Sequence, residues 1–109
     1  MFFIPDSGKV QKLLGNGMAL GVDKDVKIYE YKINGWEKGS ILVITSDGLK
    51  ESRNATGEMY GEKRIKKVIE YNKTQSAAII EKKVFEDLNI FCQNVPIADD
   101  ITIVIVKFL

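Results

Sequence analysis

The chain has 109 residues, of which 45% are hydrophobic and 28% are charged, as is typical of one globular domain with a modest core. Sixteen basic and fifteen acidic residues leave a net charge of +1, which gives no electrostatic basis for binding nucleic acid or an anionic membrane. No apolar run is long enough to span a membrane. The single cysteine, Cys92, excludes an internal disulfide and favours the reducing cytoplasm. Histidine, the commonest general base and metal ligand, is absent.

The first half of the chain predicts β-structure. Residues 2–4 and 9–14 flank a Pro-Asp-Ser-Gly turn signal at 5–8, which predicts a β-hairpin. Residues 26–33 form a second β region, and residues 40–45 contain four consecutive aliphatic side chains, the pattern of a buried strand. Because Gly-containing turn signals join these two segments, we expect them to pair as antiparallel neighbours.

The second half predicts two helices and a closing strand. After a polar loop at 49–60, residues 62–71 place Ile65, Val68 and Ile69 on one helical face. Residues 77–91 carry a second apolar stripe, with Thr74 or Ser76 as the N-cap and a proline beyond the end. Residues 101–108 are rich in β-branched side chains. The order indicates an α+β fold, a mainly antiparallel sheet with two amphipathic helices on one face.

Two carboxylates stand at strand ends. Asp47 follows the strand at 40–45 directly, and Asp99 precedes the last strand, so antiparallel pairing of these strands would bring both acids to one end of the sheet. Two like charges held close repel, and a divalent cation relieves that repulsion. Oxygen ligands without His or Cys favour Mg²⁺ or Mn²⁺. The alternative interpretation is that both are turn residues that bond to nearby backbone N–H groups.

Three motifs in order carry a family resemblance. They are Thr-Ser-Asp-Gly-Leu at 45–49, Gly-Glu-Met-Tyr-Gly at 57–61, and Asp-Asp-Ile-Thr at 99–102 before the final strand. This set resembles the PPM-type (protein phosphatase 2C-like) serine/threonine phosphatases, and within them the bacterial SpoIIE branch. The resemblance runs through nearly the whole chain and implies that the sheet is part of an α-β-β-α sandwich.

The resemblance also implies roles for individual residues. Asp47 and Asp99 correspond to metal-ligating aspartates, Asp100 to a residue beside the ligands, and Gly48 to a position that serves backbone geometry. The implied reaction is hydrolysis of phosphoserine or phosphothreonine in a bacterial signalling regulator by a metal-activated water, with two Mn²⁺ or Mg²⁺ ions and no covalent intermediate on the protein.

The family's opening elements, including a Gly-Asp motif that bridges the metals, have no counterpart in residues 1–109. We therefore expect the chain to be the C-terminal portion of the catalytic domain, inactive alone because Asp47 and Asp99 supply too few ligands. The competing hypothesis is a non-catalytic interaction module that keeps the half-fold. Either way, a sheet with one uncovered face predicts self-association of the isolated chain.

Overall fold

The computed structural model describes residues 1–5, 8, 11–13, 20–30 and 32–109. It contains a four-stranded sheet in the order β2-β1-β3-β4, in which every neighbouring pair is antiparallel. The elements in chain order are β1 (Phe2–Ile4), β2 (Gln11–Lys12), β3 (Ile41–Thr45), α1 (Asp47–Glu51), α2 (Gly61–Tyr71), α3 (Ala77–Cys92) and β4 (Ile103–Lys107). The α+β class and the mainly antiparallel sheet are therefore confirmed.

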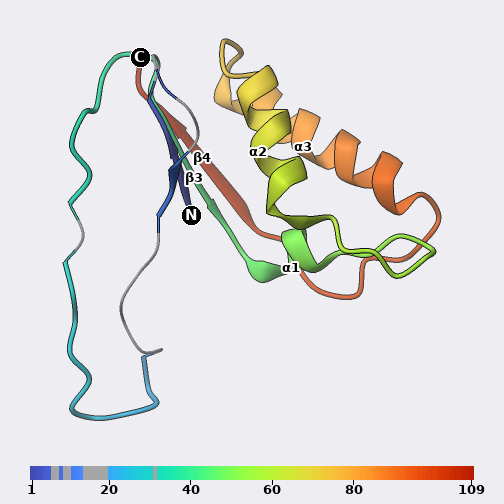
Figure 1. Ribbon diagram of the computed structural model, residues 1–109, viewed down its shortest axis with the longest axis horizontal. Helices are drawn as coiled ribbons and strands as arrows, with labels where there is room; N and C mark the ends of the chain where they lie inside the picture. Colours follow the sequence, from blue (N-terminus) through green and yellow to red (C-terminus); the bar gives the residue numbers. More distant parts are fainter. Residues whose placement is uncertain (6–7, 9–10, 14–19, 31) are drawn as a thin grey trace.

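Helices α2 and α3 lie side by side on one face of the sheet (Figure 1). The core lies between these helices and the sheet, and it is built from residues that are at most 3% exposed: Phe2, Ile4, Ile41, Val43, Leu49, Tyr60, Ile65, Ile69, Ile80, Val84, Leu88 and Cys92. The two stripes that predicted the helices supply their inward faces. Ser76 caps α3, because its side chain accepts a hydrogen bond from the Ile79 N–H at 3.3 Å.

The other face of β3 and β4 carries an apolar patch. Strand residues alternate between the two faces, so Ile41 and Val43 enter the core while Ile44 points away from it. Ile44 is paired directly with Val104, and Leu42 with Val106. The exposed fractions are 40% for Ile44, 47% for Val104 and 42% for Val106. We call these four side chains, Leu42, Ile44, Val104 and Val106, the open-face patch.

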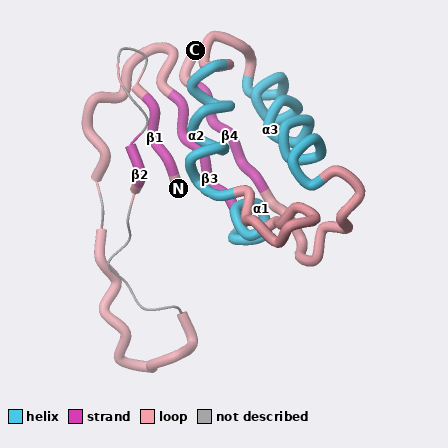
Figure 2. The backbone as a smooth tube through the Cα atoms, turned by 45° about the vertical axis from the view of Figure 1, so that its right-hand side comes forward, coloured by secondary structure: helices cyan, strands magenta, loops and turns pink. Residues whose placement is uncertain are grey.

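The segment 26–33 does not pair with β3, and that prediction was wrong for the residues described there. Both sides of β3 are already hydrogen bonded, one to β1 and the other to β4, so no edge of this strand remains for a further neighbour. Residues 26–30, 32 and 33 form no strand, and Ile28 and Tyr29 are 84% and 62% exposed. Figures 1 and 2 show this part of the chain lying apart from the sheet.

The N-terminal hairpin has its predicted antiparallel pairing, with Phe2 opposite Lys12 and Phe3 opposite Gln11. Much of its predicted turn and second strand, at residues 6–7, 9–10 and 14, lies outside the described residues. Among the helices of the described part of the chain, none combines the length and the apolar character needed to cross a membrane.

Candidate functional site at the β3–β4 end of the sheet

The segments that carry Asp47 and Asp99 meet at one end of the sheet, as the strand-end argument predicted. Thr45 at the end of β3 pairs with Ile103 at the start of β4. Beyond this pair, the Ser46 N–H donates to the Thr102 carbonyl at 2.9 Å, and the Thr102 N–H donates to Ser46 Oγ at 2.9 Å. The Ser46 hydroxyl in turn donates to the Asp100 carbonyl at 3.4 Å. Ser46 therefore joins the two acidic segments directly.

A short helix, α1, begins at Asp47, where the sequence predicted only a loop after residue 48. Ser46 stands at the N-cap in an extended conformation, and Asp47 places its negative charge in the first turn, where the helix dipole favours it. Leu49 is fully buried and anchors the helix to the core. At the other end the Ser52 hydroxyl donates to the Gly48 carbonyl at 2.7 Å. The tertiary contact of Leu49 explains why five residues form a helix that is marginal in isolation.

Gly48 allows the two segments to approach each other. A Cβ at this position would collide with the Asp100 carbonyl oxygen and would stand 3.1 Å from its carbonyl carbon and 3.5 Å from Ile101 Cγ1. The obstacle is backbone, which does not move aside as a flexible side chain does. Glycine is required here for space, so any larger residue would push α1 away from the 99–102 segment.

The two candidate carboxylates are both accessible. The Asp47 side chain is 74% exposed, and one of its oxygens forms an ion pair with Lys50 Nζ at 3.1 Å. The hydrogen bond to Asp47 raises the pKa of the Lys50 ammonium group. Asp99 is exposed, and its Oδ1 accepts a hydrogen bond from the Asp100 N–H at 2.8 Å. Lys50 did not stand out in the sequence. Its side chain meets that of Asp47, three positions earlier, only because residues 47–51 form a helix that the sequence did not predict.

Carboxylate oxygens are the type of ligand that hard cations such as Mg²⁺ and Mn²⁺ prefer. Asp47 and Asp99 do not form a complete centre by themselves. Across the part of the chain that the structure describes, no three or more His, Cys, Asp or Glu residues come together in a way that could hold a metal ion. The role of Asp47 and Asp99 as ligands, and of Asp100 beside them, stays a prediction.

A cavity of about 350 Å³ adjoins this end of the sheet. Its walls come from α1, the loop before α2 and the loop that follows α3: Gly48, Glu51, Ser52, Arg53, Met59, Val95, Pro96, Ala98 and Asp99. We call it the α1 cavity. Sequence reasoning did not find it, because the wall at 95–99 is distant along the chain from the walls at 48–59 and shares no periodic pattern with them.

The loop before α2 is firmly held. Arg53 and Met59 form an isolated antiparallel bridge, and the Arg53 guanidinium donates to the Gly57 carbonyl at 2.6 Å. The Asn54 side-chain oxygen accepts from the N–H groups of Thr56 and Glu58 at 3.1 and 3.0 Å. The wall of the α1 cavity that this loop supplies is thus ordered by its own hydrogen bonds.

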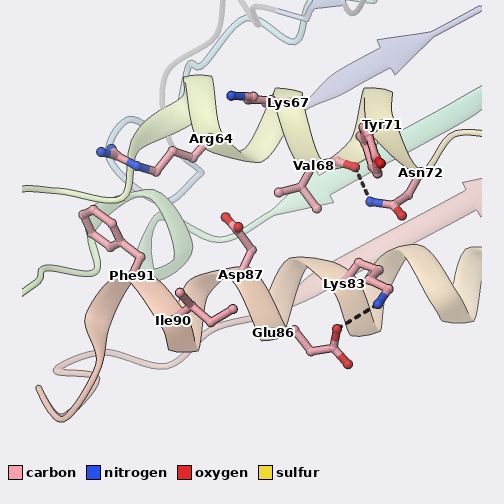
Figure 3. A pocket seen from close by; sticks show the side chains of 10 residues that line it. All are labelled: Arg64, Lys67, Val68, Tyr71, Asn72, Lys83, Glu86, Asp87, Ile90 and Phe91. Carbon is pink, nitrogen blue, oxygen red and sulfur yellow. Dashed lines mark hydrogen bonds and ion pairs between the residues drawn. The ribbon is translucent and has the colours of Figure 1, made fainter.

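A second, larger cavity of about 570 Å³ lies between α2 and α3 and includes neither Asp47 nor Asp99 (Figure 3). In it the Arg64 guanidinium stands 4.3 Å from the centre of the Phe91 ring, and Arg64 also donates to the Tyr60 carbonyl at 2.9 Å. Asp87 accepts a hydrogen bond from the Tyr60 hydroxyl at 2.6 Å. These contacts use Arg64 and Asp87, two of the five charged residues that line the cavity, for structure.

Comparison with known proteins identifies the family to which this chain belongs. The family model of Stage II sporulation protein E (SpoIIE) matches residues 1–109, so the chain belongs to the SpoIIE family. The resemblance stated from the sequence motifs is therefore confirmed. No curated protein matches the sequence.

Among solved structures, the chain is similar to the SiaA-PP2C domain of Pseudomonas aeruginosa. The TM-score is 0.72 at 21% sequence identity, and the match covers 98% of this chain and 42% of that chain. At this identity the likeness establishes the fold alone, that of part of a PP2C domain. This chain therefore spans about two-fifths of the length of the solved domain it matches.

Proposed function

We propose that the chain contributes to a metal-dependent protein serine/threonine phosphatase that hydrolyses phosphoserine or phosphothreonine in a bacterial signalling regulator. The observation that carries this proposal is the junction of the Ser-Asp-Gly segment at 46–48 with the Asp-Asp segment at 99–100 in a chain of the SpoIIE family. The free Cys92 further supports a cytoplasmic location.

Each residue of the junction has a proposed task. Asp47 and Asp99 hold divalent cations, which would supply electrostatic stabilisation of the phosphoryl group and activation of water. Gly48 keeps α1 against the backbone of Asp100, so that both carboxylates stay at one end of the sheet. Lys50 neutralises Asp47 when no cation is bound, so a cation at Asp47 would compete with this ion pair.

A non-catalytic interaction module remains the second candidate, and two observations favour it. Asp47 is already paired with Lys50, and the described residues hold no group of three ligating side chains. Two carboxylates are fewer than a two-metal centre uses. For the phosphatase we therefore propose that further acidic ligands, beyond Asp47 and Asp99, complete the centre in the full domain.

Metal-dependent hydrolysis tests the choice between these candidates. With Mn²⁺ or Mg²⁺, a complete domain that contains this sequence is expected to release phosphate from a phosphoserine protein, and the activity should disappear with EDTA. The 109-residue chain alone should release little or none. Phosphate release by the complete domain that survives EDTA would contradict the metal-dependent mechanism, and its absence under every divalent cation would favour the interaction module.

The open-face patch predicts self-association of the 109-residue chain. Burying apolar surface contributes about 25 cal/mol per Å², so a patch of half-exposed aliphatic side chains favours pairing of two copies. Val104→Lys places a charge in the patch and should shift the chain toward monomer. Ile79→Lys is the matched control, because Ile79 is similarly exposed, at 40%, but lies on α3. Sedimentation velocity over a range of concentrations measures the effect, and a wild-type monomer at micromolar concentration would contradict the proposal.

A further inference from the structure

Two of the residues that line the α1 cavity also belong to the candidate catalytic site. Gly48 follows Asp47 in the first turn of α1, and Asp99 is itself a candidate ligand; both Gly48 and Asp99 line the cavity. A phosphorylated side chain held through divalent cations at Asp47 and Asp99 would thus bring the neighbouring residues of its own polypeptide to this cavity. The position of the cavity beside the candidate site therefore indicates what kind of molecule would enter the cavity.

The lining of the cavity is mainly apolar. Met59, Val95, Pro96 and Ala98 present carbon surface, and the charged side chains of Glu51, Arg53 and Asp99 complete the walls. At about 350 Å³ the cavity lies at the lower end of the range for ligand pockets, which are typically apolar with a few polar groups that orient the ligand. That size and lining suit one aliphatic side chain with its flanking peptide units, and they disfavour a charged side chain, which would lose its hydration.

We propose that the α1 cavity is a substrate-specificity subsite, which receives an aliphatic side chain next to the phosphorylated residue of the protein substrate. This inference rests on the proposed phosphatase function and adds a sequence preference to it. The cavity is preformed: the bridge between Arg53 and Met59 and the Arg53–Gly57 hydrogen bond hold one wall in place. A preformed pocket loses little conformational entropy when a side chain enters it.

The preference has a definite expected size. Replacing leucine by alanine at the flanking position of a substrate peptide removes three carbon atoms that the cavity would bury. Such a loss of buried aliphatic surface weakens binding by roughly tenfold or more. A lysine at the same position should bind no better than alanine, since its ammonium group would have to leave water.

The test uses the 109-residue chain with methyl-labelled Met, Val and Ala residues, observed by NMR. The probes are phosphoserine peptides that carry leucine, alanine or lysine beside the phosphoserine, and the same peptides without phosphate, each with Mg²⁺. The leucine peptide is expected to shift the methyl signals of Met59, Val95 and Ala98 and to bind roughly tenfold more tightly than the alanine peptide. Absence of shifts at these methyl groups up to roughly millimolar peptide overturns the proposal.

Two matched variants locate the preference. Met59 and Ile97 are both 44% exposed, but only Met59 lines the cavity. Met59→Ala should remove most of the leucine preference, whereas Ile97→Ala should keep it. Both side chains are half-exposed, so both variants are expected to fold, and dispersed methyl spectra verify this. Equal effects of the two substitutions would overturn the proposal.

The outcomes separate the subsite from the phosphatase. If phosphorylated peptides bind more tightly than unphosphorylated ones but show no leucine preference, the subsite is wrong and the proposed function stands. If the leucine preference is present but phosphate makes no difference, the subsite is supported by itself. The phosphatase function is then decided by phosphate release from the complete domain, because the described residues of the 109-residue chain supply too few metal ligands to bind the phosphate. Only a leucine preference combined with a phosphate dependence supports both.

Discussion

Replacing Asp47 or Asp99 by asparagine is expected to lower phosphatase turnover of a complete domain by roughly a hundredfold or more. Each substitution removes a negative charge proposed to hold a cation, and stabilisation by such a cation is worth several kcal/mol in the transition state. Both carboxylates are exposed to solvent. The amide variants should therefore fold normally, and the loss should appear in turnover rather than in stability.

The measurement is the initial rate of phosphate release with Mn²⁺, accompanied by a direct titration of Mn²⁺ binding. Glu81→Gln, on the exposed surface of α3, removes the same type of charge away from the sheet end and should leave both readings unchanged. Weakened Mn²⁺ binding together with slow turnover would support the ligand role. Full-rate hydrolysis by Asp47→Asn or Asp99→Asn would exclude that residue as an essential ligand.

Tyr60→Ala is expected to destabilise the fold by about 3–5 kcal/mol, the range for removing a buried aromatic side chain. The Tyr60 ring is fully buried and packs at 5.5 Å, centre to centre, against Phe91. Its hydroxyl donates to Asp87 Oδ2 at 2.6 Å. Burial, and then the hydrogen bond to Asp87, raise the pKa of the Tyr60 hydroxyl, so this group is a neutral donor at physiological pH. Since domains are stable by about 5–15 kcal/mol, this single change approaches global unfolding.

Tyr60→Phe separates the hydrogen bond from the packing. It keeps the ring but leaves the Asp87 carboxylate without its donor, which should cost about 1.5–3 kcal/mol, the range for a bond to a charged group. Tyr71→Ala is the matched control, because Tyr71 is 89% exposed on α2 and its removal should change stability by less than about 0.5 kcal/mol. Urea denaturation followed by circular dichroism measures all three variants. Equal stability of Tyr60→Phe and the unmodified chain would show that the Asp87 bond contributes nothing net.

Tyr60 matters beyond stability because it ends the loop that contributes Arg53 and Met59 to the α1 cavity. The Tyr60 N–H donates to the Ser52 carbonyl at 2.7 Å, which closes the base of that loop. Arg64 adds hydrogen bonds to the Met59 and Tyr60 carbonyls at 3.3 and 2.9 Å. The core of the domain thus holds the wall of the proposed specificity subsite.

The elements that the sequence determined by itself are those in which one local pattern is enough. The continuous aliphatic run before Asp47 and the β-branched residues before the C-terminus specified β3 and β4, and the 3.6-residue apolar stripes specified α2 and α3. Because both acids flank these well-defined strands, their meeting at one end of the sheet followed from the antiparallel pairing alone.

Tertiary structure alone decided the features that depend on which strands pair with β3 or on contacts between distant segments. The residues at 26–33 have strand-like composition, but β1 and β4 occupy both edges of β3, and composition does not reveal which strands occupy an edge. Helix α1 is too short to be stable from local propensity and exists because Leu49 is buried in the core. The Asp47–Lys50 ion pair depends on that helix, and the α1 cavity requires the segments 48–59 and 95–99, which meet only in the folded chain.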